Sequence, residues 1–175
     1  SRRISPHLLG QSFTGGVAPI LEHESAARAR VVVDQLDYAL FPQHGYRVEA
    51  LLLAGERRTA LQVEGFHRLQ ANGSFARSWG RHTLNLFGLV DLGDVPVADT
   101  PAGRRSLGGF HLMSGYRPGQ LSGNQLLFGR VAWYMRLQRE PSVTRGFFLG
   151  GTLEAGQAWQ RRSQISLADL RTSAS

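Results

Sequence analysis

The residues that could carry out chemistry in this chain are few, and their spacing favours no particular reaction. No Gly-x-Ser-x-Gly elbow is present, the turn that exposes a strained nucleophilic serine in many hydrolases. The six histidines show no pair at metal-ligand spacing on one face, and cysteine is absent. We therefore expect no catalytic residue, no metal site and no cofactor. The residues considered are His7, His23, His44, His67, His82 and His111, with Asp34, Asp37, Asp91, Asp94, Asp99 and Asp169 mostly in predicted loops or at strand ends.

A different kind of site is indicated by residues 107–123, where Ser114 and Arg117 stand among glycines. This stretch is too rich in glycine and polar residues for a helix, and too apolar for an idle linker. A segment of alternating character, residues 124–138, follows it. We therefore predict one long loop, residues 93–123, that feeds a long strand.

Strands with a period of two dominate the rest of the chain. Leu61 and Val63, for example, alternate with Gln62 and Glu64. The alternation predicts roughly seven strands of about 10–14 residues, at 11–23, 28–40 (with a bulge), 46–54, 61–70, 79–92, 124–138 and 147–156. Turns are predicted at 23–27, 41–45, 55–58, 71–74 and 140–142, and residues 163–175 indicate a loop and the start of a strand.

The composition is that of a folded, basic chain. Of the 175 residues, 42% are hydrophobic and 19% are charged, which excludes a disordered tail. No run of about 18 apolar residues is available for a transmembrane helix. The net charge of +7 comes from arginine alone, because the sequence has no lysine. Three pairs of adjacent arginines fall in predicted loops: Arg57-Arg58, Arg104-Arg105 and Arg161-Arg162. They would be solvated charges or contacts with anionic lipid headgroups. We expect no nucleic-acid partner.

Alternation alone does not say which face of the strands is buried. A soluble ligand-binding β-barrel places its apolar residues inside, whereas an outer-membrane barrel turns them toward lipid. Charges of both signs on the polar side of the strands, such as Glu64 and Arg136, suit a wet lumen in which they can pair. Aromatic residues near strand ends, such as Trp79 and Trp159, suit a membrane interface. The predicted fold is therefore all-β, an antiparallel up-and-down transmembrane β-barrel.

Several motifs resemble the C-terminal barrel of the Omp85, or bacterial surface antigen, superfamily, in which an LGG…RGY loop folds back into the barrel. The motifs are Leu107-Gly108-Gly109, Ser114-Gly115-Tyr116 and the run from Arg130 to Arg136. Residues 150–159 and 165–172 look most like the patatin-like outer-membrane phospholipases. The resemblance covers the chain from about residue 10 to its end and is most specific from residue 105 onward. One departure is that the arginine of RGY is Ser114 here.

The resemblance implies that residues 1–175 belong to one outer-membrane β-barrel domain, the C-terminal half of a sixteen-strand barrel whose final strands are absent. Residues 93–123 would fold into its lumen. At the bacterial outer membrane, the barrel would anchor and translocate an attached patatin-like lipolytic domain, as in type V secretion. The barrel itself would not be an enzyme, although the parent protein would be a phospholipase or esterase.

Two alternatives stay open. The first is a general Omp85-type protein insertase or secretion pore, and the second, from another class, is the soluble ligand-binding β-barrel. For the membrane reading, the implied partners are outer-membrane lipid, the remainder of the barrel and an N-terminal passenger domain. A homo-oligomer is left open.

The resemblance also places one candidate site. In the family, the RGY arginine reaches across the lumen to an acidic residue, which maps by position to Glu154. With serine in place of that arginine, either Ser114 or Arg117 would make the bond and pin the loop. The other interpretation is a glycine-rich hairpin tip with incidental contacts. The predicted lumen-loop motif is Gly108, Gly109, Ser114, Gly115, Tyr116 and Arg117, with Glu154 as the loop-anchoring acid.

Overall fold

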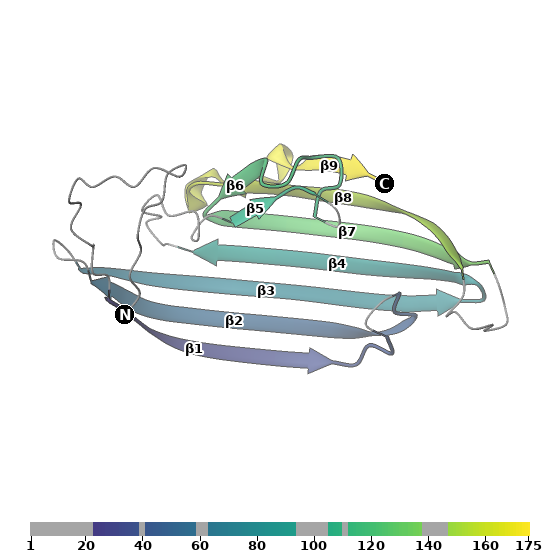
Figure 1. The fold of residues 1–175 in the computed structure, drawn as a ribbon, viewed down its shortest axis with the longest axis horizontal. Coiled ribbons are helices and arrows are strands. Elements are labelled where there is room, and N and C mark those ends of the chain that lie inside the picture. Colours follow the sequence, from purple (N-terminus) through teal and green to yellow (C-terminus); the bar gives the residue numbers. More distant parts are fainter. Residues whose placement is uncertain (1–22, 39–40, 59–62, 94–104, 110–111, 138–146) are drawn as a thin grey trace, which may run out of the picture.

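The described part of this computed structural model comprises residues 23–38, 41–58, 63–93, 105–109, 112–137 and 147–175. It is all-β, with seven strands in one antiparallel sheet and two in a small ribbon (Figure 1). The sheet order is β1 (His23–Asp34), β2 (His44–Arg58), β3 (Val63–Trp79), β4 (His82–Gly93), β7 (Gln125–Arg136), β8 (Phe148–Trp159) and β9 (Arg171–Ala174). The ribbon is β5 (Arg105–Leu107) with β6 (Leu121–Gly123), and two 3-10 helices, η1 (Arg162–Gln164) and η2 (Leu167–Asp169), precede β9.

Strands that follow one another in the chain are neighbours in the sheet. Every neighbouring pair is antiparallel, and β7 lies beside β4 after the excursion through β5 and β6. The all-β, antiparallel part of the prediction is therefore confirmed. The described sheet is open, with β1 and β9 at its edges, so closure into a barrel stays a prediction. No helix among the described residues is long and apolar enough to cross a membrane.

One face of the sheet is apolar and exposed, and we call it the apolar face. Leu86, Val131 and Leu153 are cross-strand neighbours on β4, β7 and β8, and they are 40%, 43% and 66% exposed. Val31 on β1 and Val48 on β2 continue this face and are also exposed. Large apolar side chains are therefore exposed side by side on neighbouring strands of one face.

The opposite face, which we call the polar face, carries most of the charged residues of the strands. Its members include Arg30, Asp34, Arg47, Glu49, Arg68, Asp91, Arg130 and Glu154, which the registers place on one side of the sheet. Asp91 and Glu154 are buried, with 4% and 3% of their surface exposed. At Asp91 and Glu154 the usual order, in which charges meet water and apolar side chains are covered, is therefore reversed.

The compact core lies on this polar face, beneath the segment that runs from β5 to β6. Leu107, Met113 and Leu121 of that segment are buried against Leu126 and Phe128 of β7. Figure 1 shows the segment lying over one side of the sheet, beside β7, β8 and β9. Burial of each such side chain stabilises the fold by about 1.5–3 kcal/mol, so the segment is held as a packed layer on the strands.

The predicted turn at residues 71–74 is wrong, because these residues lie inside β3. Asn72 pairs with Glu49 on β2 and with Leu89 on β4, so the strand is bonded on both sides at this point. An Asn-Gly pair favours a hairpin only locally, and two full ladders of hydrogen bonds outweigh that preference. The turn between β3 and β4 instead falls at Gly80, which has a positive φ of 61°.

The β1–β2 hairpin is longer than predicted. The turn at 23–27 and the loop at 55–58 are both wrong, because these stretches pair with each other and extend the two strands. The ladder is continuous from His23 to Asp34, so the predicted bulge in residues 28–40 is absent from the described part of that range. Strands predicted at 124–138 and 147–156 are confirmed as β7 and β8. Most of the strand predicted at 11–23, residues 94–104 of the long loop, and the turn at 140–142 lie outside the described residues.

Candidate functional site

Glu154 lies near the middle of β8, on the polar face of the sheet. It is flanked in register by Arg130 on β7 and Ser173 on β9. Only 3% of Glu154 is exposed. A buried carboxylate is costly unless charged or hydrogen-bonding groups surround it, so the surroundings of Glu154 decide whether this position is tolerated.

A single oxygen of Glu154 accepts three hydrogen bonds. The Ser114 backbone N–H donates to Oε2 at 2.6 Å and the Ser114 hydroxyl at 2.8 Å. The Ser173 hydroxyl donates to the same oxygen at 2.9 Å. Hydrogen bonds to an ionised acceptor are stronger than those between neutral groups. The carboxylate therefore joins the loop, β8 and β9 at one point.

The loop is shaped by its two consecutive glycines. Gly108 and Gly109 have φ values of 127° and 98°, which other residues rarely adopt. The Gly108 N–H donates to Leu112 O at 2.7 Å, and the Gly109 N–H donates to Tyr116 O at 2.9 Å. A Cβ on Gly108 would lie 2.0 Å from Arg117 O. The chain thus doubles back on itself, and this fold presents Ser114 to the sheet.

The residue before Ser114, Met113, is held in place by the core. It is fully buried, yet its φ is 73°, in the left-handed region that a side chain with a Cβ disfavours. Such strain costs about 1–3 kcal/mol and persists only where the surroundings impose it. Burial of Met113 in the core supplies that constraint. The strained backbone turns the Ser114 N–H and hydroxyl toward Glu154 together.

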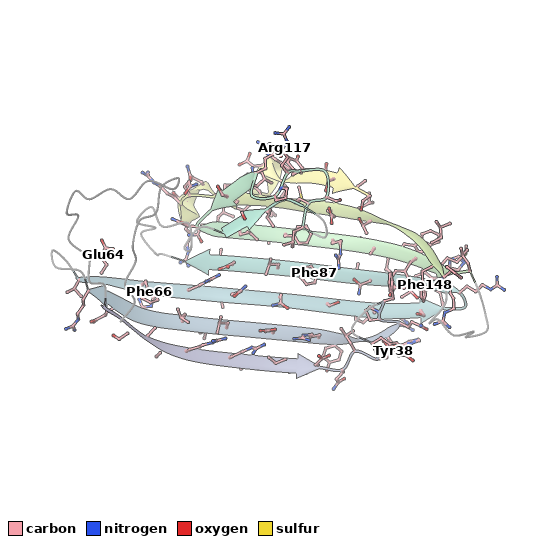
Figure 2. All side chains as sticks on the ribbon, in the orientation of Figure 1. Tyr38, Glu64, Phe66, Phe87, Arg117 and Phe148 are labelled. Carbon is pink, nitrogen blue, oxygen red and sulfur yellow. The ribbon has the colours of Figure 1, made fainter. Side chains whose placement is uncertain are left out.

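The remaining residues of the predicted motif are placed differently. The exposed Arg117 side chain projects away from the sheet (Figure 2), while its N–H donates to Gln120 Oε1 at 2.9 Å. Of the two donors that the sequence left open, Ser114 contacts Glu154 and Arg117 does not. Tyr116 is partly buried and packs against the core. Gly115 lies beside β9, since a Cβ there would be 3.0 Å from the Ser173 Cβ.

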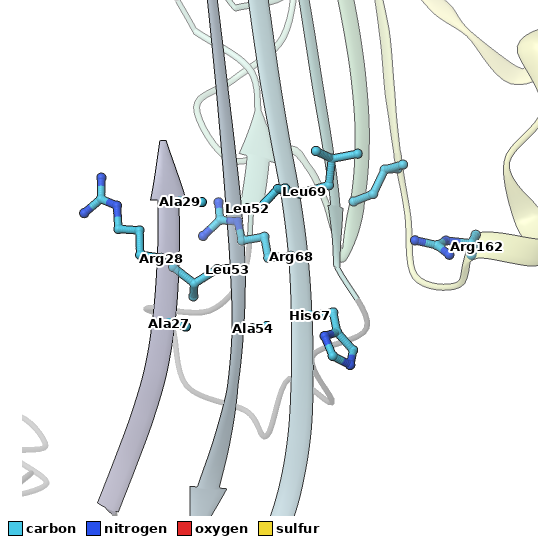
Figure 3. Close-up of a pocket in the computed structure, with 11 residues that line it drawn as sticks. Ala27, Arg28, Ala29, Leu52, Leu53, Ala54, His67, Arg68, Leu69 and Arg162 are labelled. Carbon is cyan, nitrogen blue, oxygen red and sulfur yellow. The ribbon is translucent and has the colours of Figure 1, made fainter. Parts of the chain in front are cut away.

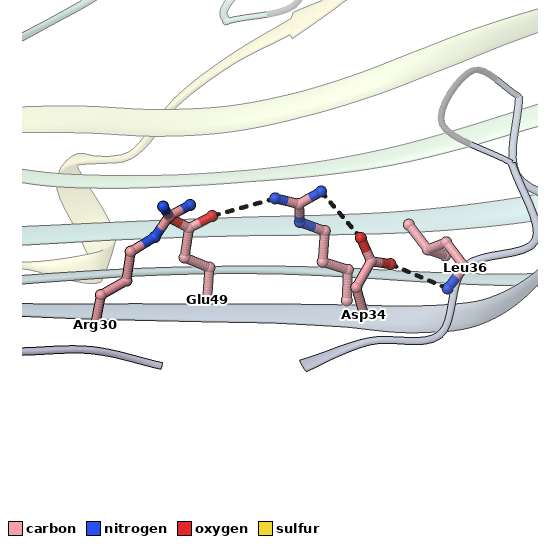
Figure 4. A network of polar contacts seen from close by, with 5 residues as sticks. Arg30, Asp34, Leu36 and Glu49 are labelled. Atoms are coloured by element: carbon pink, nitrogen blue, oxygen red, sulfur yellow. Dashed lines mark hydrogen bonds and ion pairs between the residues drawn. The ribbon is translucent and has the colours of Figure 1, made fainter. Parts of the chain in front are cut away.

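The polar face also carries ion pairs away from the loop. Arg30 contacts Glu49 at 2.7 Å, and Arg47 contacts both Asp34 at 3.1 Å and Glu49 at 3.4 Å, forming a chain across β1 and β2 (Figure 4). These side chains are partly exposed. The polar face is therefore electrostatically paired in its open part as well.

An ion pair between β3 and β4 has a buried acid, Asp91, and a partly exposed arginine, Arg68. Arg68 grips the buried Asp91 through two hydrogen bonds, Nε to Oδ1 at 3.0 Å and Nη2 to Oδ2 at 2.5 Å. This two-bond geometry fits the guanidinium fork to a carboxylate. The pair therefore fixes two neighbouring strands on the polar face, beside the half that the loop covers.

Sequence analysis did not predict a contact at the other end of the sheet. The connection between β1 and β2 folds over the polar face, where Phe41 stacks on Phe148 with ring centroids 5.0 Å apart. The Tyr134 hydroxyl donates to the Pro42 carbonyl oxygen. Phe41 also has a positive φ, 52°. The aromatic-proline pair predicted only a turn, because sequence pattern does not report a contact across about 90 residues. Ser173 and Met113 were missed for the same reason.

Comparisons with protein-family models, curated proteins and solved structures find no match for this chain. Among the described residues, no group of three or more His, Asp and Glu could hold a metal ion. The candidate site is therefore a structural contact, in which hydrogen bonds to the buried carboxylate of Glu154 attach the loop to the sheet. The family suggested by residues 107–136 and 150–172 stays a prediction.

Proposed function

We propose that this chain is part of a transmembrane β-barrel whose apolar face meets lipid and whose polar face lines the lumen. The observation that carries the proposal is the reversal of the two faces. Leu153 is two-thirds exposed, while its neighbour Glu154 is almost completely covered. A β-strand in an outer-membrane barrel alternates in this sense, with apolar residues outside and polar residues inside.

The dimensions of the strands support the same proposal. Strands β1 to β4, β7 and β8 are 12 to 17 residues long, and a tilted crossing of a bilayer needs about 9–11. Trp79 and Trp133 lie on the apolar face near the same end of the sheet, where His82 stacks on Trp133 at 5.6 Å. Tryptophan is enriched at the membrane–water interface.

The edges of the sheet define what the proposed barrel requires. In hydrocarbon, each unpaired backbone N–H or C=O costs several kcal/mol. In the described part of the chain, β1 has a strand neighbour on one side only, and β9 covers only part of β8. Further strands would have to pair with both edges. These strands would be supplied by the remainder of the barrel.

In this barrel, the loop between β4 and β7 would lie at a fixed position inside the lumen. Its attachment through Ser114 and Glu154 would hold it across the pore, and the paired charges on β1 to β3 would line the space beside it. We propose that the barrel anchors and exports an attached lipolytic domain, an assignment that rests on the patatin-like resemblance. A general insertase or secretion pore would use the same barrel. A soluble ligand-binding barrel would need the opposite arrangement of faces.

Membrane fractionation and electrophoresis test the proposal. The protein is produced with a secretion signal in a Gram-negative host, and its membranes are washed with alkaline carbonate. We expect the protein to remain in the outer-membrane fraction and to migrate faster in SDS when unheated than when boiled, since a closed barrel resists SDS. Release by the wash, with equal mobility before and after boiling, would contradict the proposal.

A further inference from the structure

A shallow groove of about 440 Å³ crosses the apolar face from β1 toward β4. Its floor is formed by Ala27, Ala29 and Ala54, whose side chains end at Cβ, and Leu52 and Leu69 rise beside them. Ala27 is the register partner of Ala54, and Ala29 that of Leu52, so the small residues adjoin one another on the strands. The groove is therefore shallow and mostly apolar, as a binding site for a hydrocarbon chain would be.

Among the described arginines that line this groove, Arg162 is the one that lies outside the strands. Arg162, from η1, is part of the lining, and Figure 3 shows its guanidinium extending from η1 toward the strands. Arg162 is exposed and forms no ion pair with another described residue. Arg28 and Arg68 also border the groove, but by register their side chains belong to the polar face, where Arg68 binds Asp91.

The position of Arg162 along the strands matches the level of a headgroup. Trp159, three residues earlier, ends β8 on the same side of the sheet as Leu153. Trp159 itself is buried, but the end of a membrane-crossing strand lies where hydrocarbon gives way to headgroups. An arginine that follows it would reach the phosphates, which the planar guanidinium binds through two parallel hydrogen bonds. Charge and apolar groove are then aligned as the two ends of a lipid are.

We propose that the groove binds one anionic membrane lipid, with an acyl chain over the alanine floor and the phosphate at Arg162. The inference rests on the proposed membrane location and adds a specific site to it. The ligand is a membrane lipid rather than free phosphate, because the alanine floor would contribute nothing to the binding of a small anion.

Native mass spectrometry of the intact protein, released from neutral detergent with added phosphatidylglycerol or phosphatidylcholine, tests the site. We expect one phosphatidylglycerol to be retained in preference to phosphatidylcholine. Arg162→Gln should weaken its retention about tenfold, the loss of a charge-assisted pair of bonds. Arg161→Gln is the matched control, because Arg161 is also exposed but does not line the groove. Ala54→Leu should weaken retention by filling the floor, and Ala50→Leu, on the same face of β2, should not.

Equal losses in Arg162→Gln and Arg161→Gln would overturn the site, because they would indicate diffuse attraction to a basic surface. Unchanged binding in Ala54→Leu, or displacement of the lipid by millimolar inorganic phosphate alone, would show that only an anion is recognised and would overturn the lipid assignment. Carbonate extraction of the same preparations separates the two proposals. A protein that stays in the membrane without preferring phosphatidylglycerol contradicts only the lipid site, whereas a soluble protein contradicts both.

Discussion

The polar face of this sheet has a covered half and an open half, and both contain carboxylates beside arginine. In the covered half, Glu154 on β8 is buried under the loop and accepts three hydrogen bonds. In the open half, Glu49 on β2 is paired with Arg30, whose side chain is 48% exposed. A carboxylate is therefore found in two environments on one face: under the loop it accepts bonds from serines, and in the open half it pairs with arginine.

Exclusion of water gives the two carboxylates different roles. Exposed ion pairs contribute about 0–1 kcal/mol because water and salt compete for both partners. A buried charge that loses its partners destabilises a fold by about 3–5 kcal/mol. We infer that Glu154 fixes the position of the loop, whereas Glu49 chiefly neutralises the arginines beside it on β1 and β2. Four substitutions test this contrast, from the largest expected effect to the smallest.

Replacement of Glu154 should have the largest effect. In Glu154→Ala, the donors of Ser114 and Ser173 lose their common acceptor inside a covered site. Because each donor left unpaired in a covered site costs about 1–3 kcal/mol, we expect the free energy of unfolding to fall by about 3–5 kcal/mol, as measured by urea titration in neutral detergent. Hydrogen exchange at Gly108, Gly109 and Tyr116 should accelerate as the loop detaches. A loss equal to that of Glu49→Ala would remove the distinction between the two halves.

Met113→Ala should come next. This change removes a fully buried side chain that also holds a strained backbone, so we expect a loss of about 2–5 kcal/mol. Val32→Ala, on the polar face of β1 and 43% exposed, is the matched change in the open half and should cost no more than about 0.5 kcal/mol. Similar losses for the two variants in one urea series would argue that the loop is not packed as described.

Ser114→Ala removes one of the two bonds that this residue gives to Glu154 and leaves the backbone N–H bond intact. We expect a loss of about 1.5–3 kcal/mol, less than for Glu154→Ala. Because both changes break the same contact, their effects should not add. A double-mutant cycle measures this directly, and strict additivity would mean that the two side chains act separately.

Glu49→Gln should have the smallest effect. It removes the charge that pairs with Arg30 and Arg47 in a half that water reaches, so we expect a change of at most about 1 kcal/mol. Salt should reduce even that difference, because added ions screen exposed charges more strongly. The check is a comparison of urea midpoints in 50 mM and 500 mM sodium chloride. A salt-independent loss of several kcal/mol would show that the open half is covered after all.

Sequence reasoning succeeded where a pattern is local and repeated. The alternation in β7 and β8 predicted both strands and which residues share a face, because side chains in a strand follow a period of two. It failed at Asn72, because strand pairing on both sides outweighs the local preference of an Asn-Gly pair for a turn. The outcome at residue 72 was decided by β2 and β4, which no window around that residue contains.

The candidate site was predicted in part for the same reason. The resemblance to a known family suggested Glu154 as the acid and left open whether Ser114 or Arg117 is the donor. Choosing between them required the backbone conformation at Met113, which is imposed by packing. Ser173 and the contact of Phe41 with Phe148 depend on the arrangement of distant strands. The resemblance therefore suggested the groups, and tertiary packing selected the partners.

The central claim is that the apolar face meets lipid and the polar face meets an aqueous lumen. The chain has no cysteine, so single cysteines can be spin-labelled along β3 in reconstituted protein. Labels at Leu69, Ala71 and Phe75 should be accessible to oxygen, which concentrates in lipid, and those at Gln70, Asn72 and Ser74 to a water-soluble nickel complex. This alternation, continuing unbroken through residues 71–74, is the predicted result. Nickel access at all six positions, or the opposite alternation, would contradict the account.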